Sequence, residues 1–204
     1  MQKNLLSLDK IRRLFRYFYR VPWCVPAWGW PEFYITVTCI LSGRVVDGPY
    51  SNRFAHAIKK YLGIKHVITV NRGRSAIELA LRALNIGQKD EVVLPSYLCR
   101  SVLEAILKVD AQPVFADIDS TLHVTTQTIK AAIGPRTKAI IVPHLFGNTA
   151  PIDEIEKMLA GTGISLIDDA AQSFGARRSG RLVGTFGDCG ILSCGPGKTL
   201  AGFA

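Results

Sequence analysis

The chain has 204 residues, of which 48% are hydrophobic and 20% charged, and its formal net charge is +9. This composition excludes a disordered or fibrous chain, and the length suits one domain with a sizeable core. Residues 1–20 hold six Lys and Arg side chains against one Asp, so +5 of the net charge lies in this segment. The basicity is therefore an N-terminal feature. It argues against a nucleic-acid-binding domain and favours anionic partners such as phosphates or acidic lipid head groups.

Residues 4–19 have the pattern of a basic amphipathic helix. Their apolar residues recur at steps of three and four, with arginines between them; they are Leu5, Leu8, Ile11, Phe15 and Phe18. This stripe fits a helix packed on its own domain or on a partner, and it also fits a helix in peripheral contact with a membrane surface. We expect residues 1–21 to form this helix and residues 22–204 to form a single domain.

The five cysteines, at positions 24, 39, 99, 189 and 194, are odd in number and irregular in spacing. No pair of Cys or His residues has the spacing of a zinc site, so we expect free thiols and no metal centre. No apolar run approaches the ~20 residues that a membrane-spanning helix needs, and the first residues lack the pattern of a signal peptide. These features predict a cytoplasmic protein.

From residue 51 onward, short apolar runs alternate with helical patterns. We expect strands at 67–70, 91–95, 113–118, 139–143, 165–169 and 190–194, and helices at 51–62, 76–84, 100–109, 126–133 and 151–160. This alternation predicts an α/β fold in which a mostly parallel sheet is covered by helices on both faces. Such sheets bind ligands at the carboxyl ends of their strands, where residues 71–75, 95–99, 144–147 and 169–172 fall.

Gly73, Arg74 and Ser75 lie where an expected strand turns into an expected helix. Free backbone N–H groups and the helix dipole at such a turn favour a phosphate, and glycine allows its close approach. The same residues also fit a plain helix cap, which is the commoner structure. The turn alone therefore leaves both interpretations open.

Asp169 and Lys198 are the charged residues that point most directly to a chemistry. Asp169 follows an apolar run, where a carboxylate is expected to be partly buried, although a solvated loop residue also fits. Lys198 lies in a glycine-rich loop, where most lysines are solvated. A buried carboxylate near an amine suits pyridoxal phosphate (PLP), whose ring nitrogen needs an anion and whose aldehyde needs an amine. A nucleotide-binding P-loop ending at Lys198 is excluded, because it requires glycine where the chain has Leu192.

Two segments carry a family resemblance: Ile167-Asp168-Asp169-Ala170-Ala171-Gln172-Ser173-Phe174-Gly175-Ala176, and Ser193 followed five residues later by Lys198. They resemble the signature of the DegT/DnrJ/EryC1/StrS family of sugar aminotransferases, which are fold-type I enzymes that use PLP. The resemblance runs from about residue 22 to the C-terminus. It implies that this region is the PLP-binding large domain of such an enzyme. It also implies a helix at 33–41, although the β-branched residues there locally favour a strand.

The resemblance also implies roles for the candidate residues. Lys198 would form the Schiff base with the cofactor and then move protons between substrate and cofactor. Asp169 would pair with the ring nitrogen, Gln172 would approach the ring hydroxyl, and Ser193 would bind the phosphate. Asp168 stands where the family usually has glutamate. One branch of the family has histidine in place of the lysine and performs dehydration, so Lys198 argues against that reaction.

Two cofactor-binding positions depart from the family pattern. Arg74 replaces the threonine that usually follows Gly73, so a phosphate turn formed with Ser75 would carry an extra positive charge. Cys99 stands where an aromatic side chain commonly stacks on the cofactor ring. Because a thiol offers less contact area, Tyr97 is a candidate to replace that contact.

The function implied by the resemblance is transfer of an amino group from a donor such as glutamate to a nucleotide-linked keto-sugar, in polysaccharide or amino-sugar biosynthesis. The family also implies a homodimer and a C-terminal small domain, which we expect to be absent from this chain. The alternative is a truncated, catalytically inactive remnant or a scaffold domain. Because positioning of the substrate contributes much of catalysis, we expect the 204-residue chain to be weak or inactive alone.

Overall fold

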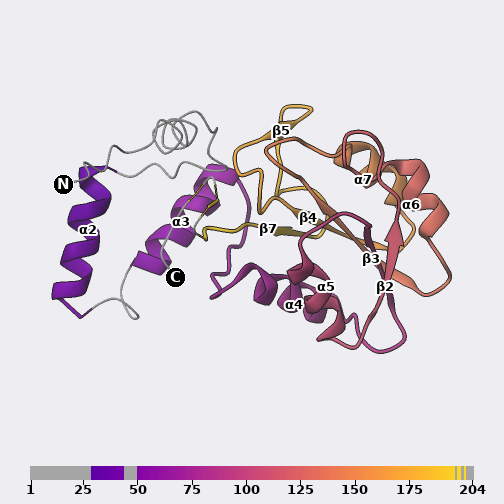
Figure 1. The fold of residues 1–204 in the computed structure, drawn as a ribbon, viewed down its shortest axis with the longest axis horizontal. Coiled ribbons are helices and arrows are strands. Elements are labelled where there is room, and N and C mark those ends of the chain that lie inside the picture. The colour runs from indigo at the N-terminus through magenta and orange to yellow at the C-terminus, as the bar shows by residue number, and fades with distance from the viewer. Residues whose placement is uncertain (1–28, 44–49, 196, 199, 201–204) are drawn as a thin grey trace, which may run out of the picture.

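The computed structural model of the chain describes residues 29–43, 50–195, 197, 198 and 200. The helix expected at 4–19 and Cys24 lie outside these residues. Within the described part, strands alternate with helices from residue 91 to residue 169, as the sequence predicts for an α/β fold (Figure 1).

The centre of the molecule is a five-stranded parallel sheet with the strand order β2-β1-β3-β4-β7. Its strands are β1 Glu91–Pro95, β2 Gln112–Ala116, β3 Thr137–Pro143, β4 Ser165–Asp169 and β7 Cys189–Ile191. Between β4 and β7 the chain forms a small antiparallel ribbon of β5 Arg177–Arg178 and β6 Arg181–Leu182. The chain runs from β1 outward to β2 and then returns to β3 on the other side of β1. A ligand crevice is expected at the carboxyl ends of β1 and β3, where this reversal occurs.

Helices cover both faces of the sheet, which confirms the expected architecture (Figure 1). One face carries α4 Gly73–Ala83 and α5 Arg100–Leu107, and the other carries α6 Thr126–Ala132 and α7 Ile152–Leu159. Val92 and Leu94 of β1 join the core under α4 and α5, whereas Val93 between them joins the core under α6 and α7. Strand side chains alternate, so a strand covered on both faces is a continuous apolar run.

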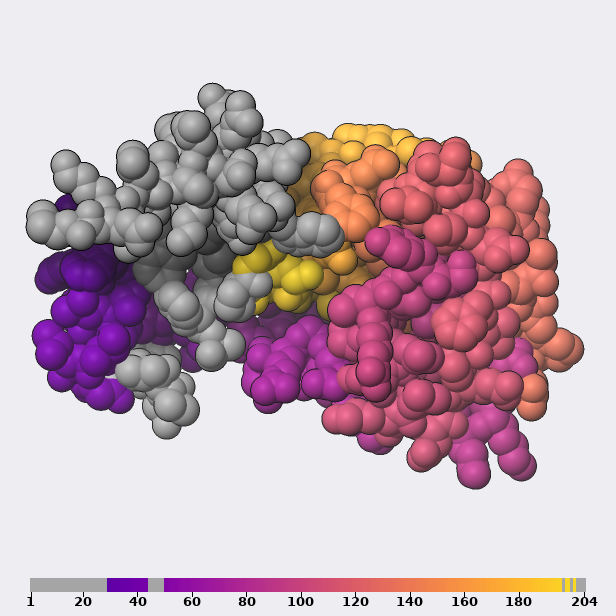
Figure 2. Space-filling model, in the orientation of Figure 1, coloured from indigo at the N-terminus to yellow at the C-terminus, as the bar shows by residue number. Residues whose placement is uncertain are grey.

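Two further helices, α2 Trp30–Leu41 and α3 Tyr50–Leu62, lie at one end of the molecule (Figures 1 and 2). The first confirms the helix expected at 33–41, and Pro31 in its first turn suits a helix start. None of the residues of α2 is buried, and Trp30 is 83% exposed. The second helix contacts the sheet region through the Tyr61 ring, which stacks on Phe174 with ring centroids 5.4 Å apart.

Residues 67–70, predicted as a strand, are not part of a strand in the described chain. A strand needs a neighbour for its backbone N–H and C=O groups, and no described strand pairs with this segment. Ile68 is 73% exposed and Val70 is 40% exposed. The prediction was wrong because a β-branched run shows a local preference and says nothing about whether a partner is present.

Two element boundaries differ from the prediction in ways that concern the candidate site. Helix α4 begins at Gly73 rather than at residue 76, so Gly73, Arg74 and Ser75 form its first turn. Strand β7 ends at Ile191 rather than at 194, so Ser193 lies in the loop that follows. Both changes place polar residues at the ends of elements, where backbone groups are open to a ligand.

Candidate active site

A cavity of about 240 Å³ lies at the carboxyl ends of the central strands and at the N-terminal end of α4. Seven of the eight residues that the sequence singled out line it: Gly73, Arg74, Cys99, Asp169, Gln172, Ser193 and Lys198. Ser75, the eighth, is not part of the wall. These seven residues come from the start of α4, from the segment after β1, from the end of β4 and the loop after it, and from the loop after β7. The parallel sheet thus brings together residues that are up to 125 positions apart, from Gly73 to Lys198.

Asp169 is the buried carboxylate of the cavity. It ends β4 and shares the α4 and α5 side of the sheet with Ile167, because side chains alternate along the strand. Its side chain is 5% exposed, and the Ala171 N–H donates to its Oδ1 at 3.0 Å. Burial raises the pKa of Asp169, while the Ala171 hydrogen bond and the nearby charge of Lys198 act in the opposite direction. Because burial disfavours the charged form of Asp169, a cationic group placed beside it would stabilise the carboxylate.

Asp168, the preceding residue, is directed to the other side of the sheet and is not a cavity residue. Its Oδ1 lies 2.8 Å from His144 Nε2, and its Oδ2 accepts the N–H groups of Gly184 at 2.6 Å and Phe186 at 3.0 Å. The Ala150 N–H donates to His144 Nδ1 at 3.0 Å, so the imidazole proton lies on Nε2 and is donated to Asp168. Asp168 therefore fixes the loops that frame the site.

The N-terminal end of α4 forms one wall of the cavity. The first backbone hydrogen bond of this helix joins the Ala76 N–H to the Arg72 carbonyl, 3.1 Å apart. The N–H groups of Gly73, Arg74 and Ser75 are therefore the donors that a helix leaves open at its start. The hydroxyl of Ser193 stands next to them, since a Cβ placed on Gly73 would lie 4.0 Å from Ser193 Oγ. These donors form a corner whose chemistry suits an anion, and it is called the anion-binding corner below.

Lys198 and Gln172 reach the cavity from two loops. The backbone N–H of Lys198 donates to the Gly195 carbonyl at 3.1 Å in the loop after β7. The carbonyl of Gln172 accepts the Gly147 N–H at 3.1 Å, which joins the loops that follow β3 and β4. These backbone bonds fix the two loops from which Gln172 and Lys198 line the cavity.

Arg74 lines the cavity, but its guanidinium also forms an ion pair with another helix. Its Nη1 donates to Oε2 of Glu104 on α5. The other carboxylate oxygen, Oε1, accepts a contact from Arg100 Nε at 3.1 Å. The extra positive charge expected at this turn is therefore shared with a carboxylate, which the sequence pattern did not indicate.

Cys99 lines the cavity as the N-cap residue of α5, and its thiol lies 3.1 Å from Ser101 Oγ. Tyr97, considered as a substitute for the aromatic side chain missing at this position, is 48% exposed and is not part of the cavity wall. Neither side chain gives the cavity an aromatic wall from this loop. A ligand ring held there would contact a thiol.

Three further polar residues line the cavity and were not among the individual candidates: Arg72, Ser101 and His144. Arg72 and His144 fall in the segments 71–75 and 144–147, which were expected at the ligand-binding edge of the sheet. Arg72 and Ser101 each lie within two residues of an identified position, so the turn before α4 and the start of α5 were the features that could have indicated them. His144 lies in a segment expected at the end of a strand, but nothing in the sequence linked it to Asp168, 24 residues later.

Among the described residues, no group of three or more His, Cys, Asp or Glu side chains could hold a metal ion. Cys39, Cys99, Cys189 and Cys194 are free cysteines. Within the part of the chain that the structure describes, no helix is both long enough and apolar enough to cross a membrane.

Residues 33–204 match the sequence profile of the DegT/DnrJ/EryC1/StrS aminotransferase family. The chain belongs to this family. Its five-stranded parallel sheet with helices on both faces corresponds to the large domain of a fold-type I aminotransferase. The resemblance noted in the two short segments therefore extends over most of the chain.

Two curated relatives are enzymes that act on sugars attached to nucleotides. A dTDP-3-amino-3,4,6-trideoxy-alpha-D-glucose transaminase of Micromonospora megalomicea subsp. nigra is 36% identical over 163 residues, which are 79% of this chain and 44% of that protein. A UDP-N-acetyl-3-dehydro-alpha-D-glucosamine 3-aminotransferase of Acidithiobacillus ferrooxidans is 44% identical over 139 residues, which are 68% of this chain and 38% of that protein.

Among solved structures, GDP-4-keto-6-deoxy-D-mannose-3-dehydratase of E. coli with bound hydrated PLP is similar, with a TM-score of 0.82 and 27% identity. The similarity covers 89% of this chain and 49% of that chain. This chain therefore spans less than half the length of these three relatives.

Proposed function

We propose that the cavity binds PLP and that this chain forms the cofactor-binding part of an aminotransferase. The observation that carries the proposal is the buried carboxylate of Asp169 in the same cavity as Lys198 and the N-terminal end of α4. A ring nitrogen, an aldehyde and a phosphate would each meet a group of matching chemistry there.

The residues present fit this cofactor. Burial makes the negative charge of Asp169 costly, so a protonated ring nitrogen beside it would stabilise the carboxylate. The open N–H groups of the first turn of α4 and the Ser193 hydroxyl supply donors for phosphate oxygens. The cavity is lined by three cationic side chains, Arg72, Arg74 and Lys198, and one carboxylate, which favours an anionic ligand overall.

PLP, when bound, supplies an electron sink that stabilises the carbanion formed when a substrate Cα–H bond breaks. Asp169 would keep the ring nitrogen protonated through its negative charge. Lys198 Nζ would bind the cofactor aldehyde and then carry the proton that leaves the substrate carbon. The Gln172 amide would contact the ring hydroxyl, and Cys99 would lie against the ring.

The proposed reaction moves an amino group from a donor such as glutamate to a nucleotide-linked keto-sugar, within polysaccharide or amino-sugar biosynthesis. The two curated relatives support this acceptor class, since both are named as aminating enzymes of nucleotide-linked sugars. Although one structural relative is a dehydratase, the presence of Lys198 rather than histidine favours amino transfer.

The proposal extends to the setting of the enzyme. A homodimer in the cytoplasm fits the family resemblance and the free cysteines in the described chain. Residues 1–21 would form a basic amphipathic helix, with peripheral membrane contact as one role for residues 4–19. Residues 22–204 would then form the large domain.

The cofactor proposal is tested by borohydride reduction of the purified chain after incubation with PLP, followed by peptide mass mapping. The expected adduct lies on the peptide that contains Lys198 and is lost in Lys198→Arg. Lys157→Arg is a matched control, because Lys157 is an exposed lysine of α7 outside the cavity wall, and this variant should keep the adduct. An adduct on another lysine, or none in folded protein, would overturn the proposal.

A competing function is a catalytically inactive relative that binds the cofactor or scaffolds a partner. It is favoured by one observation: Cys99 stands where the family commonly has an aromatic side chain, and Tyr97 does not line the cavity, so this loop gives a cofactor ring no aromatic contact. Amino transfer from glutamate to a panel of nucleotide-linked keto-sugars decides between the two functions. Transfer that disappears in Lys198→Arg supports the enzyme, whereas PLP bound at Lys198 without transfer supports the inactive relative.

A further inference from the structure

Arg74 and Glu104 form an ion pair at the edge of the anion-binding corner. Arg74 is the second residue of α4 and lines the cavity, while its guanidinium donates to Glu104 Oε2 on α5. The two side chains are 32% and 34% exposed, so the pair lies at the boundary between cavity and solvent. Glu104 itself is not part of the cavity wall. A cavity residue is thus held by a carboxylate outside the cavity.

Glu104 has a second cationic partner on the same helix. Arg100 Nε lies 3.1 Å from Oε1, whereas Arg74 contacts Oε2, so each arginine has its own carboxylate oxygen. If the Arg74 guanidinium moves away, the Glu104 carboxylate remains paired with Arg100 and exposed to solvent. No unpaired charge is left buried, and it is a buried unpaired charge that makes breaking an ion pair costly.

A phosphate bound on the cavity side would compete with Glu104 as an acceptor for the Arg74 guanidinium. The first-turn N–H groups of α4 and the Ser193 hydroxyl form a corner that suits a phosphate, and Arg74 belongs to that same turn. A phosphate monoester carries more negative charge than one carboxylate that is already shared between two arginines. Phosphate is therefore the stronger acceptor for the guanidinium when both are within reach.

We propose that Glu104 is a positioning residue that sets how much of the Arg74 charge is available to the cofactor phosphate. Without a phosphate, Glu104 holds the guanidinium. When a phosphate enters the corner, Arg74 exchanges Glu104 for a phosphate oxygen and Arg100 stays with Glu104. This inference rests on the proposed function and deepens it, because it assigns discrimination between phosphorylated and unphosphorylated pyridoxal to the Arg74 and Glu104 pair.

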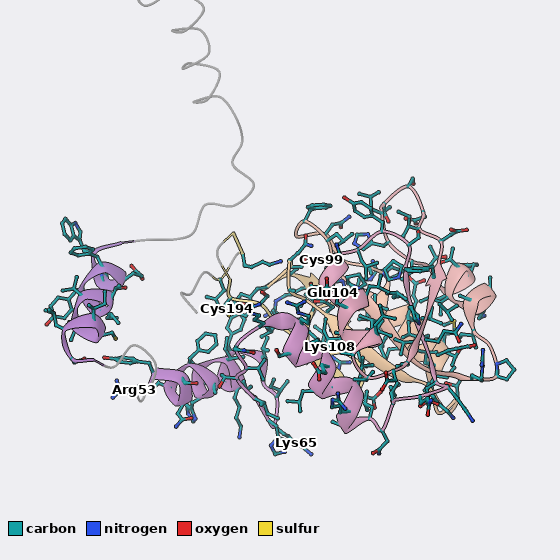
Figure 3. The ribbon with its side chains drawn as sticks, turned by 60° about the horizontal axis from the view of Figure 1, so that its bottom comes forward. Arg53, Lys65, Cys99, Glu104, Lys108 and Cys194 are labelled. Atoms are coloured by element: carbon teal, nitrogen blue, oxygen red, sulfur yellow. The ribbon has the colours of Figure 1, made fainter. Side chains whose placement is uncertain are left out.

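The chain offers a matched control on the same two helices. Glu78 of α4 lies 3.1 Å from Arg82 Nη2 and 3.7 Å from Lys108 Nζ at the end of α5, and it is 26% exposed. Like Glu104, it accepts from two cations and links α4 to α5. It is not a cavity residue, and Lys108 lies at the far end of α5 from Cys99 (Figure 3). Glu78→Gln therefore removes a comparable charge without releasing Arg74.

The test measures equilibrium binding of PLP, of pyridoxal, which lacks the phosphate, and of inorganic phosphate to the 204-residue chain. Glu104→Gln should tighten PLP and phosphate binding by about three- to fivefold, the size of one exposed ion pair. Arg74→Gln should weaken both by about tenfold, as expected for losing one charge-assisted hydrogen bond. Pyridoxal binding should stay unchanged in both variants, and Glu78→Gln should match the wild type for all three ligands.

The double variant separates action through Arg74 from a direct effect of the Glu104 charge. Arg74→Gln with Glu104→Gln should bind PLP like Arg74→Gln alone. If Glu104→Gln still tightens PLP binding in the absence of Arg74, or behaves like Glu78→Gln, the inference is wrong while the cofactor proposal stands. If inorganic phosphate shows the expected dependence on both residues but PLP forms no adduct at Lys198, the pair is supported and the cofactor proposal fails.

Discussion

At the end of β4, two neighbouring aspartates lie on opposite faces of the sheet and have different surroundings. On the side of α6 and α7, Asp168 is fully buried and accepts from His144, Gly184 and Phe186. On the side of α4 and α5, Asp169 accepts the Ala171 N–H and lines the cavity. Two chemically identical side chains therefore have different roles: Asp168 stabilises the loops on one face, and Asp169 provides a site for a cationic group on the other. Strand alternation alone produces this division.

The largest expected effect on stability follows from removing the Asp168 carboxylate. Asp168→Ala leaves one imidazole N–H and two backbone N–H groups buried without their acceptor, so it should lower the free energy of unfolding by about 3–5 kcal/mol. Urea denaturation followed by far-ultraviolet circular dichroism measures this loss. Asp188→Ala is the control: Asp188 accepts the Leu166 N–H at 2.9 Å, and its loss should cost only about 1 kcal/mol. Equal losses in the two variants would refute the structural role given to Asp168.

A second variant tests the same face through its backbone. Gly190 is the register partner of Asp168, and a Cβ at this position would lie 1.9 Å from the Gly184 carbonyl oxygen. Gly190→Ala should therefore displace the loop that donates to Asp168 and cost about 1–3 kcal/mol of unfolding free energy. The same denaturation measurement applies. A variant as stable as the wild type would mean that the two backbones separate without cost.

On the cavity face, removing a charge should raise stability. Because burial raises the pKa of Asp169, its negative charge opposes folding, so Asp169→Asn should increase the free energy of unfolding at neutral pH, as expected where function opposes stability. The folded state binds the Asp169 proton more tightly than the unfolded state does, so the wild type loses stability as pH rises through the raised pKa. The difference between variant and wild type should therefore be small in acid, grow as pH rises through that pKa, and then level off.

The same substitution should weaken the cofactor site. If PLP binds as proposed, Asp169→Asn should lose the protonated ring nitrogen while adduct formation at Lys198 remains possible. Thermal denaturation across the pH range and absorbance titration with PLP test the two effects separately. A variant that is destabilised at neutral pH, or that transfers amino groups as fast as the wild type, would contradict the role assigned to Asp169.

The smallest effect is expected at the start of α4. A Cβ on Gly73 would meet Ser193 at 4.0 Å, an ordinary van der Waals distance, so Gly73→Ala should change the unfolding free energy by no more than about 0.5 kcal/mol. The added methyl group still occupies space in the anion-binding corner, so affinity for PLP should fall while affinity for pyridoxal should not. A loss of stability as large as that of Gly190→Ala would remove the contrast between the faces.

Much of this arrangement follows from local sequence patterns. The apolar runs at β1, β3 and β4 and the helical periodicities between them predicted the parallel sheet, because strands buried on both faces are continuous apolar segments. Asp169 was identified because it ends such a run. Its place at a ligand site needed only the rule that strand ends in these sheets gather at one edge.

The features that were missed depend on contacts between distant residues. Residues 67–70 have the composition of a strand but no described partner, which no local pattern reports. The pairing of Arg74 with Glu104 joins positions 30 residues apart on different helices. Asp168 had no predicted role beyond its place in the family motif, and only the positions of Gly184 and Phe186 identify it as an acceptor within the fold.

The position of the tryptophans has an optical consequence. All three lie between residues 23 and 30, and Trp30 is 83% exposed on α2. The sheet and its cavity therefore contribute no indole fluorescence, and unfolding of the sheet would leave the emission of Trp30 almost unchanged. Bound PLP would absorb in the region where indole emits. Energy transfer from Trp30 to the cofactor would then depend on the distance between α2 and the cavity, with donor and acceptor supplied by the protein and its cofactor.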